Sequence, residues 1–183
     1  LVRYHDRQGV AVLKGVDASY EQLTQIDSIL IDGSFKLADE VVNYANLGIG
    51  LAYALGINAG FVTPMEIYAP KRAERVNMAN PASSFQLEYA YIGSVFRTDQ
   101  QLYDDSYLIV PLALARSLFD YEHEVSAIEL KLHDSKQVAQ AKQEISRLLG
   151  EEFKVQDRFE QQEDSFRMMQ IEKWMTFLIL TFI

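Results

Sequence analysis

An uncharged apolar run at the C-terminal end limits the possible folds of this chain more than any other feature. Its ten residues, 174–183, contain no charge and only two threonines, and they are apolar on every helical face. The order Glu172, Lys173, Trp174 is typical of a membrane interface, where charges stay in water and Trp lies among the headgroups. Ten helical residues cover ~15 Å, about half of a ~30 Å hydrocarbon core. We therefore predict a truncated transmembrane helix, entered at Glu172, Lys173 and Trp174.

The residues before this run favour one continuous helix. No Pro or Gly occurs between 158 and 183, and α-helices resist bending unless Pro, Gly or a bulge intervenes. We predict a stalk helix over 158–183 that leads into the membrane. An alternative stays open, because 10 to 14 apolar residues more commonly form a buried core helix. In that case the chain is a soluble binding module.

Composition excludes several classes of function. The net charge is −9 and the pI is about 4.8, whereas a nucleic-acid phosphate backbone needs a basic stripe, so we expect no nucleic-acid partner. The chain has no cysteine, which removes disulfides and thiolate metal sites but is compatible with any compartment.

Strand-like and helix-like segments alternate along the chain and predict an α+β fold. A hairpin turn is expected at 6–9 and a short helix at 19–26, with Ser19 as N-cap. The segment 41–57 is a strand that becomes a helix at the flexible turn Gly48–Gly50 and ends at Gly56. Further strands are expected at 1–5, 10–16, 64–70, 85–96 and 106–110, and a helix follows Pro111.

The pattern of the last third predicts a βαβ unit. Residues 125–132 alternate apolar and polar side chains, which is typical of a half-buried strand. An amphipathic helix follows, with a capping box from Asp134 to Gln137 and a stop at Gly150. Residues 152–157 return as a second strand, completing a unit of about the usual ~30 residues.

No pattern of catalytic residues is present, so we expect no enzymatic activity, no cofactor and no metal. In "GIGLAY" a tyrosine, Tyr53, occupies the third glycine position of a dinucleotide fingerprint, and no P-loop motif occurs. His123 and Glu124 begin like a zinc-protease HExxH, but Ala127 stands where the second histidine is needed. The paired carboxylates are sequence neighbours in predicted, solvated turns. Neither member of such a pair is buried, so the two do not form a general acid and a general base.

The order of segments resembles a known family. The series is "VLKGVD", "GIGLAYALGI", "MEIYAP", "YAYIGSVF", "DDSYLIVPLALARSLF", "VSAIELKL", a capped helix and "IEKWMTFLILTFI". It is similar to the extracytoplasmic domain of FtsX-like ABC transporter permeases, of the lipoprotein-releasing LolC/LolE type and more distantly of MacB. The resemblance implies a Porter-like subdomain at 1–27 and 125–157, incomplete at its N-terminal part. It also implies an inserted, mainly-β Sabre-like subdomain at 28–124.

The resemblance also implies a location and partners. The domain would lie on the periplasmic side of the inner membrane of a Gram-negative bacterium, in contact with the lipid bilayer. A cytoplasmic ATPase subunit and a second permease subunit would complete the transporter, which releases lipoproteins to a periplasmic carrier. A related mechanotransmission permease, serving efflux or the regulation of a cell-wall hydrolase, stays open as an alternative.

One long segment is a candidate for partner binding. Residues 71–86 lie between two predicted strands and are longer than the two to five residues that a tight hairpin needs. In the LolC/LolE type a protruding hairpin at this place in the order, the hook, captures the carrier. From the position of this segment, the resemblance implies that its basic residues steer an acidic partner and that Met78 and Pro81 supply apolar contact. The candidate residues are Lys71, Arg72, Arg75, Met78, Asn80 and Pro81.

Overall fold

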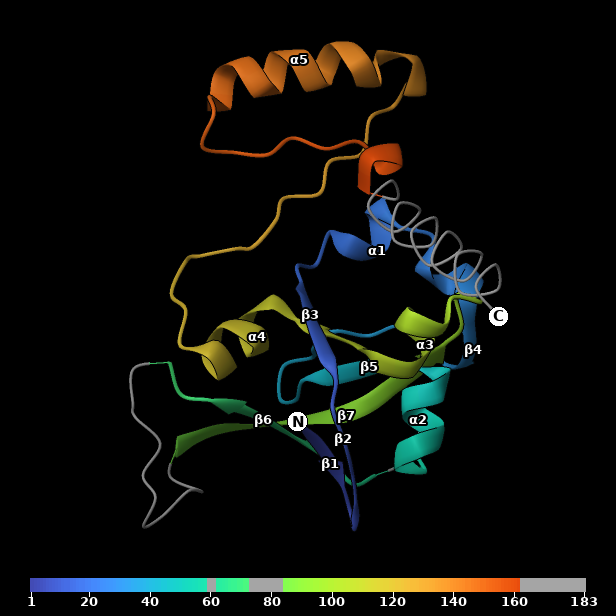
Figure 1. Cartoon of the computed structure of the whole chain (residues 1–183). Coiled ribbons are helices and arrows are strands. Elements are labelled where there is room, and N and C mark those ends of the chain that lie inside the picture. Colours follow the sequence, from blue (N-terminus) through green and yellow to red (C-terminus); the bar gives the residue numbers. More distant parts are fainter. Residues whose placement is uncertain (59–61, 73–83, 162–183) are drawn as a thin grey trace, which may run out of the picture. The chain divides into compact units, whose positions relative to one another are not determined.

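A mixed eight-stranded sheet with helices packed against it is the main structure of the chain, so the fold is α+β as predicted (Figure 1). The computed structural model describes residues 1–58, 62–72 and 84–161. Contacts divide the chain into two units, Leu1–Ile128 and Glu129–Ile183. Residues 1–27 thus share a unit, and a sheet, with most of the segment 28–124.

The sheet has the strand order β2-β1-β6-β7-β5-β8-β3, and β4 pairs with the C-terminal end of β7. The pairs β5–β7 and β3–β8 are parallel and the others are antiparallel. The strands are β1 (Val2–Tyr4), β2 (Arg7–Gly9), β3 (Val12–Val16), β4 (Leu30–Gly33), β5 (Tyr44–Gly48), β6 (Met65–Pro70), β7 (Phe85–Phe96) and β8 (Tyr107–Pro111).

The two end strands of this order are consecutive in the sequence. Only Val10 and Ala11 separate β2 from β3, although these strands are at opposite ends of the strand order. Because an extended residue spans at most ~3.3–3.6 Å, the two edges approach closely at this point. The sheet is therefore strongly curled, and its concave side encloses the main core.

Besides a helix that begins at residue 158, seven short helical segments have full bounds in the described part of the chain. They are α1 (Tyr20–Leu23), η1 (Ile26–Ile29), α2 (Ile49–Leu55), α3 (Gln101–Ser106), α4 (Leu112–Phe119), η3 (Ser135–Gln137) and α5 (Val138–Leu149). As predicted, α2 ends at Gly56, whose positive φ of 67° suits glycine, and α4 begins after Pro111. Ser19 occupies the N-cap of α1, but its hydroxyl donates to the Asp17 carboxylate instead of accepting from a helix amide.

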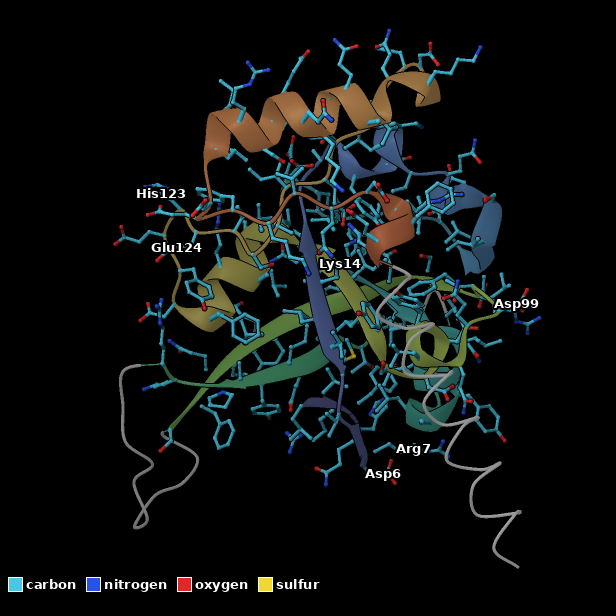
Figure 2. All side chains as sticks on the ribbon, turned by 45° about the horizontal axis from the view of Figure 1, so that its top comes forward. Asp6, Arg7, Lys14, Asp99, His123 and Glu124 are labelled. Carbon is cyan, nitrogen blue, oxygen red and sulfur yellow. The ribbon has the colours of Figure 1, made fainter. Side chains whose placement is uncertain are left out.

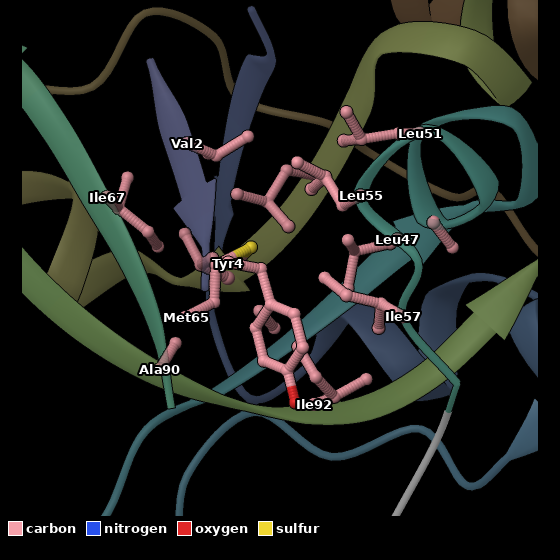
Figure 3. Close-up of a cluster of buried hydrophobic side chains, with 14 of the residues drawn as sticks. Val2, Tyr4, Leu47, Leu51, Leu55, Ile57, Met65, Ile67, Ala90 and Ile92 are labelled. Carbon is pink, nitrogen blue, oxygen red and sulfur yellow. The ribbon is translucent and has the colours of Figure 1, made fainter. Parts of the chain in front are cut away.

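The hydrophobic core is divided between the two faces of the sheet. The larger cluster contains side chains from β1, β5, β6, β7, α2 and α4, including Tyr4, Leu47, Leu55 and Met65 (Figure 3). Side chains of consecutive strand residues point to opposite faces. A smaller cluster therefore lies behind the first, formed by Val16, Ile26, Phe35, Phe96 and Ile109.

The β5–α2 junction is closely packed, not flexible as its sequence suggested. A Cβ atom at Gly48 would lie 2.4 Å from the carbonyl oxygen of Asp104 and 2.6 Å from that of Tyr103. Gly48 has an extended conformation with φ −62°, so glycine is needed there for space and not for conformational freedom. The short helix α3 rests directly on this junction.

A buried polar pair lies where β5 meets β7. The ladder pairs Ala45 with Ile92 and Asn46 with Ser94, so Gly93 is the extra residue of a β-bulge. Asn46 and Ser94 are both fully buried, and the Ser94 hydroxyl donates to Asn46 Oδ1 at 2.6 Å. Asn46 Nδ2 donates to the Lys36 carbonyl at 2.8 Å. Every buried side-chain polar atom of the pair has a hydrogen-bond partner in the described residues.

The predicted N-terminal hairpin forms with a different turn. Tyr4 pairs with Arg7, so the turn is His5–Asp6, and His5 adopts a positive φ of 53°. Residues 7–9, predicted as the turn, form β2 instead. The strand expected at 10–16 does not return to β1 but pairs in parallel with β8.

The prediction of two strands in the last third is wrong in this structure. Residues 125–132 and 152–157 form no strand, and 125–132 are exposed throughout. Only the helix of the predicted βαβ unit is present, as α5, and none of its residues is buried. An alternating pattern forms a strand only where a neighbouring strand offers hydrogen bonds.

Candidate functional site

The candidate binding segment is carried by a long hairpin, as the sequence predicted. Strands β6 and β7 pair in antiparallel register from Met65↔Ala90 to Pro70↔Phe85. One more backbone hydrogen bond, from Lys71 N–H to the Ser84 carbonyl at 2.9 Å, closes the ladder. Phe85 and Gln86 belong to β7, so the connection is 71–84 and not 71–86. This is still longer than a tight turn needs.

The predicted site residues fall into two groups. Lys71 and Arg72 are described and stand at the base of the connection. The other candidates of this segment and of the membrane entry lie outside the described residues: Arg75, Met78, Asn80, Pro81, Glu172, Lys173 and Trp174. Within residues 1–58, 62–72 and 84–161, no helix is both long enough and apolar enough to cross a membrane.

Arg72 faces its own domain, which the sequence did not indicate. Its guanidinium lies over the ring of Tyr121 at 4.7 Å from the ring centroid, and its Nη1 is 3.8 Å from Glu124 Oε1. Residues 121–124 form the exit turn, the segment that follows α4. Figure 2 shows His123 and Glu124 next to each other in this turn. The Arg72 charge therefore pairs with Glu124, whereas the resemblance implied that it faces an acidic partner.

The outer face of the hairpin carries an apolar stripe that sequence analysis missed. Phe85, Leu87 and Tyr89 alternate along β7 and are 40%, 38% and 50% exposed. Ala90 and Ile92, on the opposite face, are buried in the core. No signal in the sequence indicated this exposure, because the alternation of these three side chains with Gln86 and Glu88 is the pattern of a strand that buries its apolar face.

A polar cluster on β1 and β6 borders this stripe. Arg3 Nη2 forms an ion pair with Glu66 at 2.5 Å, and its guanidinium lies 5.7 Å from the centre of the Tyr68 ring. The Tyr68 hydroxyl donates to the same carboxylate at 2.5 Å, which raises the pKa of Tyr68 above its ordinary value. Arg3 and Glu66 thus compensate each other, and the stripe is bordered by little net charge.

The described residues offer no group of three or more His, Cys, Asp or Glu side chains placed to hold a metal ion. His5 and His123 lie in separate turns, and His133 belongs to the second unit. Asp104, the one buried carboxylate in the described chain, accepts hydrogen bonds from Thr98 N–H at 2.7 Å and Thr98 Oγ1 at 2.9 Å. Its surroundings indicate a structural role.

In the second unit, the start of the predicted stalk helix has a reciprocal capping box. The amides of Phe159 and Glu160 donate to Asp157 Oδ1, and the Asp157 amide donates to Glu160 Oε2. Lys142, on α5, forms ion pairs with Asp157 at 3.8 Å and with Glu160. This arrangement ties α5 to the beginning of the helix at 158.

These contacts predict a pH dependence of the helix start. The ion pair with Lys142 lowers the pKa of Glu160, and amide hydrogen bonds lower that of Asp157, while Glu160 raises the pKa of Lys142. The carboxylate contribution is present above the ordinary pKa values of 3.8 and 4.5 and is lost as pH falls through the lowered ones. The lysine contribution is lost only above its ordinary 10.5. Amide exchange at Phe159 and Glu160 should therefore stay slowest at neutral pH, after correction for intrinsic rates, and Lys142→Met should reduce this protection.

Comparisons with known proteins add no family to this description. No protein-family model matches the chain, and a search of curated proteins found no significant match. The function is therefore argued from the residues and their geometry.

Proposed function

We propose that this chain is the periplasmic domain of an FtsX-like ABC transporter permease that takes part in ATP-driven release of lipoproteins to a periplasmic carrier. The observation that carries the proposal is the β6–β7 hairpin. Its ladder is complete to Pro70↔Phe85, and fourteen residues, 71–84, connect the two strands. A protruding hairpin at this place in the element order is what carrier capture in the LolC/LolE type requires.

The exposed stripe on β7 supports a binding role for the hairpin. Contiguous apolar surface on a soluble protein, when the patch is large, commonly marks an interaction site. Phe85, Leu87 and Tyr89 begin at the closed end of the ladder and follow the same strand. A carrier held by the connection would meet this stripe directly, and burial of three large side chains would contribute to its affinity.

The remaining parts of the chain are assigned by the same proposal. The proposal assigns 1–27 and 125–157 to the Porter-like part, 28–124 to the Sabre-like part and 158–183 to the stalk that enters the membrane, although β3 of the first segment pairs with β8 of the Sabre-like part. A cytoplasmic ATPase subunit hydrolyses ATP, and a second permease subunit completes the transporter in the inner membrane. The capping box at Asp157 and the ion pairs of Lys142 support a stiff start of the stalk.

Replacement of the hairpin connection tests the proposal. A short Gly-Ser turn in place of 73–83 keeps Ser84, which is buried and accepts the hydrogen bond from Lys71. We expect the melting temperature to change by less than about 3 °C, because the change leaves every core residue of the described part of the chain in place. Binding of the source organism's lipoprotein carrier, measured by calorimetry, should be lost.

A second variant separates the connection from the strand. Leu87→Ser with Tyr89→Ser removes two of the three side chains of the stripe and leaves the connection intact, and we expect carrier affinity to fall about tenfold or more. The matched control is Tyr53→Ser, which changes an 85% exposed aromatic side chain on α2. Unchanged carrier affinity in the Gly-Ser variant would refute the assignment of the hairpin as the binding element.

A further inference from the structure

We propose that Arg72 is a positioning residue that fixes the base of the β6–β7 hairpin to the exit turn, and not a charge presented to a partner. Only the expected effect of Arg72 on carrier binding rests on the proposed function. Its decisive measurement is made on the protein alone, so failure of one proposal can be distinguished from failure of the other.

The hairpin side of this contact is well defined. The last bond of the ladder, between Lys71 N–H and the Ser84 carbonyl, lies one residue before Arg72. The Arg72 backbone therefore leaves the sheet at a fixed place. From there its side chain extends to the exit turn, with the guanidinium 4.7 Å from the centre of the Tyr121 ring.

The exit turn is also an ordered structure. Glu124 Oε2 accepts hydrogen bonds from the amides of Glu122 at 3.0 Å and His123 at 3.1 Å. Arg116, on α4, donates to the His123 carbonyl at 2.9 Å and to the Glu124 carbonyl at 3.4 Å. The amides of Glu124 and His123, and to a smaller extent Arg72, lower the pKa of Glu124, so this carboxylate is ionised near neutral pH.

The chemistry of the contact favours arginine over lysine. A planar guanidinium can stack on the Tyr121 ring and pair with a carboxylate at its edge, whereas a lysine ammonium is a compact hydrated charge that cannot stack. The ion pair by itself is weak, since both side chains are more than half exposed, at 58% and 59%. Stacking and pairing together join the hairpin base to the turn.

Amide exchange measured by NMR tests the coupling. We expect Arg72→Lys to accelerate exchange at Lys71, on the hairpin, and at Glu122 and His123, in the turn, by about two- to fivefold. Tyr121→Leu should accelerate exchange at Lys71 to a similar extent, although Tyr121 does not belong to the hairpin. This reciprocal effect is expected only if the two segments are joined.

Arg3→Met is the matched control. It removes another surface arginine with an ion pair and an aromatic contact, but one on β1, away from the exit turn. We expect unchanged exchange at Glu122 and His123. If Tyr121→Leu leaves the Lys71 amide unaffected, or if Arg72→Lys behaves like the wild type at all three amides, the positioning role is rejected.

Carrier affinity provides a second, independent readout. A positioning residue predicts that Arg72→Lys and Arg72→Ala weaken carrier binding equally, because both lose the stack. If Arg72→Lys keeps wild-type affinity while Arg72→Ala loses it, Arg72 is a contact charge and the inference is wrong. If the wild-type domain binds no carrier, the proposed function fails, and the exchange results still decide the role of Arg72.

Discussion

Replacing Gly48 with alanine should destabilise the domain by about 3 kcal/mol, at the upper end of what overpacking usually costs. The added Cβ would lie 2.4 Å and 2.6 Å from two carbonyl oxygens of α3, and neither is the flexible end of a side chain. Relief requires α3 to move away from β5. That movement also disturbs Asp104, whose carboxylate holds the Thr98 amide. Urea unfolding followed by circular dichroism measures the effect.

Gly9→Ala is the control for the change from glycine to alanine itself. A Cβ at Gly9 meets only the Leu51 and Leu55 side chains, at 3.5 Å and 3.8 Å, which is ordinary contact. The smaller conformational freedom of alanine in the unfolded chain should leave this variant as stable as the wild type, or more stable by up to about 1 kcal/mol. Equal stability of the Gly48→Ala and Gly9→Ala proteins would contradict the packing argument.

Asn46→Ala should have an effect of similar size, about 3 kcal/mol, through lost hydrogen bonds and not through overpacking. The variant leaves the Ser94 hydroxyl without its acceptor and the Lys36 carbonyl without its donor. Ser94 is fully buried, so water cannot replace the lost partner at little cost. Thermal and urea unfolding should both report the loss.

A double-mutant cycle identifies the cause of that loss. Ser94→Ala alone should cost about 1–2 kcal/mol, because it leaves Asn46 Oδ1 unsatisfied. With both residues changed, no group of the pair remains unsatisfied, so the double variant should be more stable than the sum of the two single effects implies. Strict additivity would show that Asn46 acts through its bond to the Lys36 carbonyl or through its volume, and not through the hydrogen bond from Ser94.

The elements that local chemistry defines were predictable from the sequence. β7 covers 85–96 as expected, α4 begins after Pro111, and Gly56 ends α2. In each case the deciding interaction is within a few residues: a turn, a proline or a glycine with positive φ. The pairing of strands was not predictable in this way. Residues 7–9 contain no apolar alternation, and they form β2 only because β1 offers a free edge.

The position of the binding segment was predictable from the sequence, but its contacts were not. The unusual length of the segment after β6 identified the hairpin, since length and bounding strands are visible in sequence. The environment of Arg72 depends on Tyr121 and Glu124, which lie about fifty positions later and give no local signal. The same limit explains the error at 125–132, where the alternating pattern is genuine but the described structure places no strand beside it.

The return of β3 to the far edge of the sheet has a consequence for biosynthesis. Val12 pairs with Tyr107 and Val2 with Ile67. The first strands to be synthesised therefore pair with strands that are synthesised much later. At about 5–20 residues per second, the ribosome adds Tyr107 some 5–20 s after Val12. During this interval the N-terminal strands have unpaired edges, which are sites of aggregation. A chaperone bound to the nascent chain would therefore protect these edges until β8 has been synthesised.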